Sequence, residues 1–290
     1  MSDHAITIRE EYQRKVFIFI SLFLLLALIA AGIFAFSFRS NQILQERQQE
    51  LQEAAFRVAR KIPITAHEAL ISRDQQESDE YLEVQTLLKA ILDANPGFDD
   101  VYTLRPTQTA HIFQFIVSGK DTEDENNDGI IDESEEKAYL TELYDATNSP
   151  ELEKGLLAPT ADKNITYDKW GSWLSGYAPL RNAKGQAVAV VGVDMKAELI
   201  KERRAELARN VGIAMLLVVP IIILAAFLLA RWLSRPFEVL ALGMSRVSHG
   251  DYHYRLPMKG DKINDAFSEL FNNMLNMYDP EHRPKRDQKN

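Results

Sequence analysis

The stretch WGSWLSGYAPLRNAKGQAVAVVGVD, residues 170–194, contains two apolar segments separated by a turn. Residues 173–179 and 187–194 are rich in aromatic and β-branched side chains, which favour strands. Residues 181–185 between them hold Asn and Gly, which are typical of tight turns. The pattern therefore predicts two strands that pair as an antiparallel hairpin.

The segments before this hairpin predict the rest of an α+β fold. Residues 101–105 and 111–117 read as two further strands, and residues 79–94 read as a helix. A longer helix ends at Pro63, because apolar residues recur at helical spacing before it: Ile43, Leu51, Ala55, Val58 and Ile62. We expect an antiparallel sheet that packs against this long helix.

Two apolar runs flank the α+β segment. Residues 16–36 contain Ser21 as their only conventionally polar side chain, and residues 211–230 contain none. Each run is about 30 Å long as a helix, which matches the hydrocarbon thickness of a bilayer. The sequence predicts two transmembrane helices. The first run is alternatively a cleaved signal peptide, although it exceeds the roughly 7–15 apolar residues of such a peptide.

The chain after the second run predicts two amphipathic helices. One stripe consists of Phe237, Leu240, Met244 and Val247. The other consists of Ile263, Phe267, Leu270, Met274 and Met277. Neither helix can bury its stripe alone, so two chains are expected to form a parallel four-helix bundle as a homodimer. A generic coiled coil is the alternative.

This terminal segment resembles a HAMP domain over residues 231–278. The resemblance rests on Pro236, residues 249–251 (HGD), residues 260–263 (GDKI), Phe267 and residues 271–272 (FN). The second helix of a HAMP domain usually opens with Asp-Glu, whereas Lys262 follows Asp261 here. The resemblance implies a cytoplasmic relay of movement from the membrane span to an output. It also implies that residues 37–210 lie outside the cytoplasm.

Residues 40–200 resemble a single-module Cache (PDC, PAS-like) sensor domain. The matching stretches are residues 102–106 (YTLRP), 170–180 (WGSWLSGYAPL), 185–188 (GQAV) and 191–194 (VGVD). The order of domains resembles the sensory half of bacterial Cache-HAMP nucleotide cyclases without the cyclase. The resemblance implies a small-molecule ligand bound on one face of the sheet.

A set of aromatic and charged residues forms the candidate ligand site. Trp173, Ser175 and Tyr177 share one face of their strand by alternation, as Asp194 does with the even-numbered residues of the next strand. We expect Asp194 to pair with a ligand amine and Arg105 with a carboxylate. Tyr102, Trp170, Trp173 and Tyr177 would enclose the remainder. Alternatively, the aromatic side chains are ordinary core residues and the two charges are structural.

Residues 124–135 (DENNDGIIDESE) match the twelve-residue calcium loop. Calcium takes six to eight oxygen ligands, and glycine at position 6 permits the sharp turn between them. The predicted ligands are Asp124, Asn126, Asp128, the carbonyl of Ile130, Asp132 and Glu135. A strand precedes the loop, where an EF-hand has a helix, and a helix is expected after it. A solvated acidic loop is the alternative.

Composition excludes several functions. The chain has 290 residues and no cysteine, which rules out disulfides, thiolate metal sites and cysteine nucleophiles. Its formal charge of −9 argues against binding to nucleic acid. We expect no organic cofactor. His67 is expected on the surface of a helix.

These features predict a receptor of the bacterial cytoplasmic (inner) membrane rather than an enzyme. Its segments are a cytoplasmic tail (1–15), a span (16–36), the sensor (37–210), a span (211–230), a HAMP domain (231–283) and a short tail (284–290). The output would be a separate cytoplasmic protein. The alternatives are the sensory part of a split or truncated cyclase or histidine kinase, and a chemoreceptor-like module, which the short cytoplasmic segment disfavours.

Overall fold

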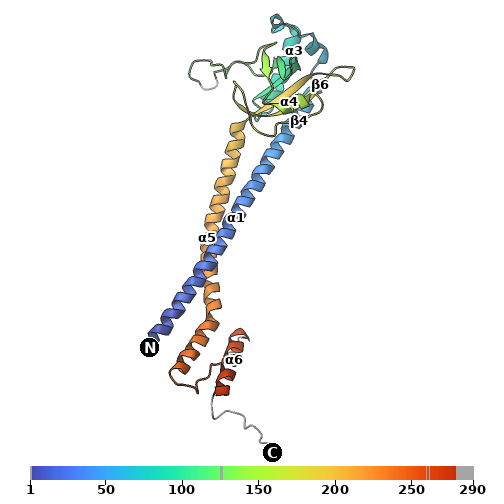
Figure 1. Cartoon of the computed structure of the whole chain (residues 1–290). Helices are drawn as coiled ribbons and strands as arrows, with labels where there is room; N and C mark the ends of the chain where they lie inside the picture. Colours follow the sequence, from blue (N-terminus) through green and yellow to red (C-terminus); the bar gives the residue numbers. More distant parts are fainter. Residues whose placement is uncertain (1, 125–126, 259, 261, 279–290) are drawn as a thin grey trace, which may run out of the picture. The chain divides into compact units, whose positions relative to one another are not determined.

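The computed structural model describes residues 2–124, 127–258, 260 and 262–278 (Figure 1). The chain divides into two compact units. We call Phe36–Arg209 the α+β unit, and Met1–Ala35 together with Asn210–Asn290 the helical unit. Helix α1 (Ser2–Ala59) and helix α5 (Ala197–Ser248) contribute residues to both units.

The α+β unit is built on an antiparallel sheet of seven strands. Its order is β3-β2-β1-β7-β6-β4, and β5 also pairs with β6. The strands are β1 (Asp100–Pro106), β2 (Ile112–Ser118), β3 (Leu143–Asp145), β4 (Thr160–Ala161), β5 (Thr166–Tyr167), β6 (Ser172–Arg181) and β7 (Ala187–Lys196). The four strands expected from the sequence are confirmed within two residues of their ends.

The turn of the β6–β7 hairpin follows from its sequence. Gly185 has φ +78°, which L side chains rarely adopt, and its N–H donates to the Asn182 carbonyl at 2.9 Å. The Asn182 side-chain oxygen accepts the N–H groups of Lys184 and Gln186, each at 3.0 Å. These bonds set the register in which Ser175 lies opposite Asp194.

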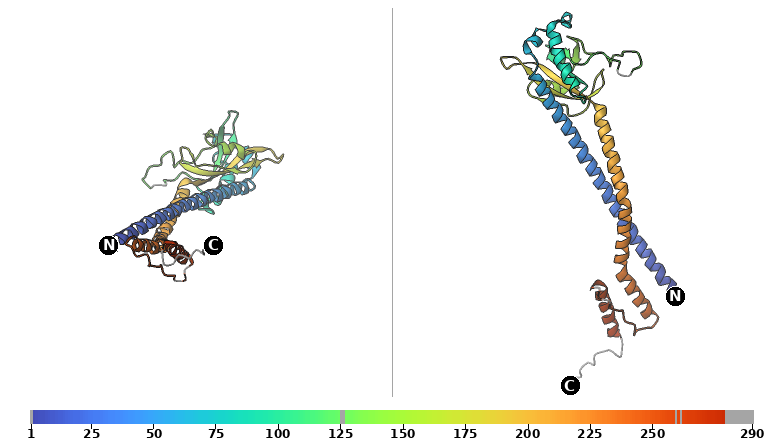
Figure 2. Two further views of the ribbon diagram at one scale, coloured as in Figure 1. Left: turned by 60° about the horizontal axis from the view of Figure 1, so that its bottom comes forward. Right: turned by 180° about the vertical axis from the view of Figure 1, so that it is seen from behind.

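Helices cover one face of the sheet. Four residues of α1, namely Leu51, Ala54, Ala55 and Val58, pack with α3 (Asp79–Asp93) against β6 and β7. The view from behind in Figure 2 shows α3 in front of the sheet. The predicted apolar stripe of the long helix is confirmed here, although α1 ends at Ala59, before Pro63. We call this side the helix-covered face.

His67 belongs to the helix-covered face, so its expected surface position is wrong. Helix α2 (Ile64–Ala69) packs it against the sheet, where it is 0% exposed and its Nε2 lies 3.0 Å from Thr103 Oγ1. Burial, helped by the charge of Arg105, lowers the pKa of His67 to about 3. The imidazole is therefore neutral at physiological pH and acts as a core side chain.

The opposite side, which we call the loop-covered face, is closed by loops and by the short helix α4 (Pro150–Gly155). Tyr102, Leu104, Tyr177 and Val190 form its buried cluster. Gly155 lets α4 approach the sheet, because a Cβ there would lie 2.6 Å from the Cβ of Tyr177. Figure 1 shows α4 beside β4 and β6.

Helices α1 and α5 are long and apolar enough to cross a membrane, by length and composition. Of the most apolar stretch of each, 0% and 11% is buried, whereas the core helix of a water-soluble protein is mostly buried. Gly32 of α1 lies close to α5, since a Cβ on it would meet Met215 Sδ at 2.3 Å. Small residues at such crossings are typical of membrane helices.

In the helical unit, the end of α5 and α6 (Lys262–Tyr278) run in the same direction. Phe237 lies 6.3 Å from Phe267, ring to ring, and a Cβ at Gly243 would meet the Phe271 ring at 2.7 Å. Asn272 holds Leu256, which lies in the segment between α5 and α6, through two hydrogen bonds with its backbone at 2.8 and 3.0 Å. Phe271 and Leu275 are buried against it, which the sequence did not predict.

Candidate ligand-binding site

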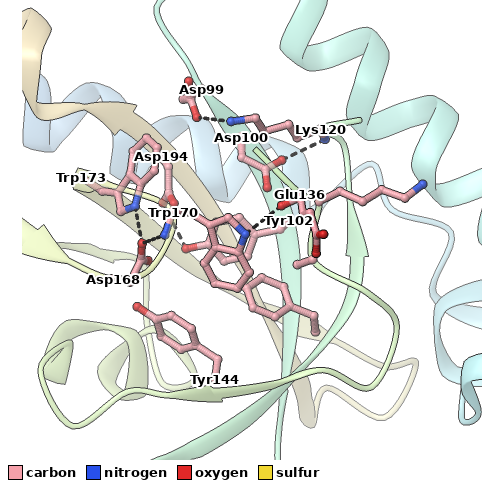
Figure 3. A pocket seen from close by; sticks show the side chains of 13 residues that line it. Asp99, Asp100, Tyr102, Lys120, Glu136, Tyr144, Asp168, Trp170, Trp173 and Asp194 are labelled. Carbon is pink, nitrogen blue, oxygen red and sulfur yellow. Dashed lines mark hydrogen bonds and ion pairs between the residues drawn. The ribbon is translucent and has the colours of Figure 1, made fainter. Parts of the chain in front are cut away.

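A cavity opens on the loop-covered face of the sheet, between β1, β7 and the loop before β6 (Figure 3). Its volume is about 40 Å³, room for roughly three water molecules. The cavity as it stands therefore fits the head of a small ligand, of a few non-hydrogen atoms. Carboxyl groups and aromatic rings dominate its lining.

Five aromatic side chains line the cavity: Tyr102, Phe115, Tyr144, Trp170 and Trp173. The Phe115 ring is central to this group, with ring centroids 5.5 Å from Tyr102, 5.8 Å from Tyr144 and 5.3 Å from Trp170. The Tyr102 ring lies across β7, where Gly192 leaves space for it. A Cβ at Gly192 would lie 2.4 Å from that ring.

Two carboxyl groups face each other at the ends of the central strands. Asp100 of β1 and Asp194 of β7 are directly paired in the antiparallel register, so their side chains share a face. Tyr102 Oη donates to Asp194 Oδ1 at 3.0 Å. Burial raises the pKa of Asp194 well above its usual range, and the charge of Asp100 adds to this. Burial also raises the pKa of Asp100 to about 6, against hydrogen bonds from Ser118 and Val101.

A third carboxyl group, Asp168, fixes the two indoles. Its Oδ1 accepts the Trp173 Nε1–H at 2.8 Å and the N–H groups of Trp170 and Gly171 at 2.9 and 3.1 Å. Burial raises the pKa of Asp168. The Trp170 Nε1–H donates to the Glu136 carbonyl at 2.8 Å (Figure 3).

Four of the six residues predicted from the sequence line this cavity: Tyr102, Trp170, Trp173 and Asp194. Tyr177 lies on the expected face but outside the lining. It is 1% exposed beneath α4, and its Oη lies 3.4 Å from Asp162 Oδ2. The roles of these residues in binding stay predictions.

Arg105 is not brought to the cavity. Its guanidinium donates to the carbonyls of Leu70 at 2.9 Å and His67 at 3.0 Å, on the helix-covered face. Arg105 is three residues from Tyr102 on the same strand, and residues an odd number apart point to opposite faces. The expected pairing of Arg105 with a ligand carboxylate is therefore corrected, because Arg105 supports the end of α2.

Sequence reasoning missed Asp100, Phe115, Tyr144 and Asp168. The Asp168-x-Trp-Gly order was a usable signal, since Asp side chains often accept N–H groups two residues ahead in turns. Asp100 had no such signal, because only the β1–β7 register reveals that it faces Asp194.

The acidic loop has the backbone of a tight turn at its glycine. Gly129 has φ +85°, and Asp124 accepts the N–H groups of Asp128 and Gly129 at 3.2 and 2.8 Å. Ile130 and Asp132 are exposed, and Glu135 is buried. Asn126 lies outside the described residues. Residues 133–135 and 140–141 form turns and residues 137–139 between them have no regular structure, so the helix expected after the loop is absent from this described segment.

Within the described ranges, no three acidic or histidine side chains gather in a metal-binding group. The calcium ligands predicted from the sequence, Asp124, Asp128, Ile130, Asp132 and Glu135 together with Asn126, remain a prediction.

No protein-family model matches the chain. A curated protein of Bacillus thuringiensis subsp. konkukian (strain 97-27), named "Probable methyl-accepting chemotaxis protein", is 24% identical over 157 residues. The match covers 51% of this chain and 27% of that protein, so the chain spans about a quarter of the length of its relative. The sequence is thus similar to part of a chemotaxis receptor.

Solved structures of chemoreceptor domains are less similar to the chain in sequence than this curated protein is. The ligand-binding domain of Campylobacter jejuni chemoreceptor Tlp3 in complex with L-valine is 14% identical, with a TM-score of 0.35 over 67% of this chain and 66% of that chain. A structure titled "Methyl-accepting Chemotaxis protein X" is 13% identical, with a TM-score of 0.30 over 61% and 68% of the two chains. TM-scores of this size do not establish a shared fold.

Proposed function

We propose that the chain is a membrane-anchored receptor whose α+β unit binds a small ligand with an amino group outside the cytoplasm. The observation that carries the proposal is the cavity that Asp194, Tyr102 and two tryptophans line. Buried carboxyl groups among aromatic rings are typical of sites for small cationic groups. Apolar helices flank this unit in the sequence, which supports an anchored sensor.

The helical unit is proposed to act as a HAMP-type relay to a separate cytoplasmic output protein. The parallel course of α5 and α6 supports this interpretation. Their remaining apolar side chains are exposed: Phe237, Met244, Phe267, Leu270, Met274 and Met277. A second copy of the chain would bury these stripes in a parallel homodimer of the inner membrane.

Ligand binding is expected to work by biasing two arrangements of the receptor. Only a ligand with different affinity for the two states shifts their populations. No chemical step on the ligand is required, so we propose a receptor rather than an enzyme. The acidic loop is proposed to bind calcium weakly, in the range of about 10⁻⁴–10⁻³ M that extracellular modules show.

A second candidate function is the sensory part of a chemotaxis receptor. The sequence similarity to part of a methyl-accepting chemotaxis protein favours it over the cyclase and kinase alternatives. A pull-down from membranes with the full chain as bait separates these candidates by the class of output protein captured.

The proposed function is tested with the full chain in lipid nanodiscs. Small amines and amino acids are screened by thermal shift, and hits are measured by calorimetry for the parent and Asp194→Asn. The proposal expects at least one hit, with binding weakened about tenfold or more in Asp194→Asn. Absence of every hit, or equal binding by the variant, contradicts it.

A further inference from the structure

Three hydrogen-bond donors around the cavity, two indole N–H groups and one phenol, are already engaged within the protein. The indole N–H groups of Trp170 and Trp173 donate to Glu136 O and Asp168 Oδ1, each at 2.8 Å. Tyr102 Oη donates to Asp194 Oδ1 at 3.0 Å. A ligand carboxylate entering here would have to break one of these bonds, or pair with a lysine of the lining, to gain a partner of its own.

The charges of the cavity lining also disfavour a ligand carboxylate. Five acidic residues line the cavity, Asp99, Asp100, Glu136, Asp168 and Asp194, against the lysines Lys120 and Lys137. Lys120 Nζ pairs with Asp99 at 3.1 Å, and Asp99 also pairs with Lys196 at 2.9 Å. Asp100 and Asp194 are the two carboxyl groups of the lining that the neighbouring central strands carry directly opposite each other.

The aromatic rings complement a positive charge. A cation over the face of Trp, Tyr or Phe is attracted by the ring, more strongly when the site is desolvated. Tyr102, Tyr144 and Trp170 surround the Phe115 ring within 6 Å, centroid to centroid. Aromatic groups of this kind bind ammonium ions, whereas a carboxylate is repelled by the ring faces.

We propose that this cavity takes an organic ammonium ion that carries no carboxylate, held between Asp100 and Asp194 and enclosed by the aromatic rings. The inference rests on the proposed function, and it narrows the ligand from amino compounds in general to simple amines and quaternary ammonium ions. A small head is required, because the cavity measures about 40 Å³. Asp100 becomes a ligand-binding residue equal in importance to Asp194.

Matched pairs of ligands test the inference. Ethylamine and isobutylamine are alanine and valine without the carboxylate, so each pair differs in that group alone. Calorimetry on the full chain in nanodiscs at pH 8 is expected to show each amine binding about tenfold or more tighter than its amino acid. Asp100→Asn and Asp194→Asn should each weaken amine binding about tenfold or more. Tyr102→Phe, which removes only the hydroxyl on Asp194, provides a milder variant.

Lys137→Ala is the matched control, since Lys137 is the other basic side chain of the lining. Because Lys137 adds a positive charge to the lining, its removal should leave amine binding as tight as in the parent or tighter. Alanine or valine binding as tightly as the matching amine, with that binding lost in Lys137→Ala, overturns the inference while the proposed function stands. If no amine and no amino acid binds, the proposed function fails and the inference fails with it.

Discussion

The two faces of the sheet share the same strands but differ in chemistry. On the helix-covered face, Leu174, Val191 and Val193 are 0% exposed among aliphatic side chains of α1 and α3. On the loop-covered face, the same strands present Trp173, Ser175 and Asp194, and the carboxyl groups have raised pKa values. Alternation along each strand thus separates residues that hold the fold from residues that can bind a ligand.

The loop-covered face contains buried carboxyl groups, which lower the stability of the fold. Asp100 and Asp194 occupy directly paired positions, where like charges destabilise an antiparallel sheet. A core designed for stability alone would place apolar residues there. The difference between the faces therefore favours the loop-covered face as the candidate site, independently of any relative.

The largest effect is expected from Gly176→Ala on the helix-covered face. A Cβ there would lie 2.3 Å from the Leu51 carbonyl carbon, so the backbone of α1 must shift. We expect a loss of about 3 kcal/mol, seen as a melting temperature roughly 6–12 °C lower for the full chain in nanodiscs. An unchanged melting temperature would show that α1 does not pack closely on β6.

Arg105→Ala should come next. The variant removes the side-chain donor from the carbonyls of Leu70 and His67, and leaves His67 O with the Leu70 N–H at 3.4 Å. It should cost about 2 kcal/mol, or roughly 4–8 °C in melting temperature. Amine affinity, measured by calorimetry, should stay within about twofold of the parent. A large loss of amine affinity with no loss of stability would show that Arg105 belongs to the ligand-binding site.

Gly192→Ala is the counterpart of Gly176→Ala on the loop-covered face. The new Cβ meets the Tyr102 ring, a side chain that can move, rather than backbone. We expect about 1 kcal/mol of destabilisation, with amine binding weakened because Tyr102 leaves Asp194. Full retention of binding would show that the position of Tyr102 is unimportant for the ligand.

The smallest effect is a dependence of stability on pH from the buried acids of this face. Burial raises the pKa of Asp162 to about 7, and Glu151 adds to this against hydrogen bonds from Ser175. The unfolded chain gives up this proton near pH 4 and the folded chain near pH 7, so stability should fall as pH rises across that window.

Asp162→Asn tests the sign of this effect. The melting temperature of the parent should fall between pH 5 and pH 7.5, and the variant should show a distinctly smaller fall. The pKa of Asp100, raised to about 6, adds a slope of the same sign in both proteins. A melting temperature that rises over this range, or an identical slope in the variant, contradicts the assignment.

The main elements of the fold were predictable because their patterns are local. The β6–β7 hairpin has two apolar strands and a turn that contains Asn182 and Gly185. Ser78 caps the N-terminus of α3, and its side chain accepts the Tyr81 N–H. Strands β3, β4 and β5 span only two or three residues and exist through pairing with β2 and β6. Such strands leave no periodic signal in the sequence.

Site residues were predictable where alternation along a single strand decides their face. They were not predictable where the pairing register of two strands brings them together. Trp173 and Asp194 were placed on one cavity because each strand was read with a period of two. The same period places Arg105 on the opposite face of β1 from Tyr102. Alternation along this strand therefore corrects the prediction that Arg105 lines the site. His67 was misplaced because burial of α2 depends on the sheet beneath it, and a six-residue helix has too few turns to reveal a buried face.

The most direct test compares Asp194→Asn with Arg105→Ala in calorimetric titrations with isobutylamine, using the full chain in nanodiscs. Each variant removes one ionisable side chain, and the two side chains lie on opposite faces of the same sheet. The account predicts that Asp194→Asn weakens binding about tenfold or more while Arg105→Ala leaves it unchanged. Equal losses, or loss of binding in Arg105→Ala alone, would contradict the assignment of the ligand to the loop-covered face.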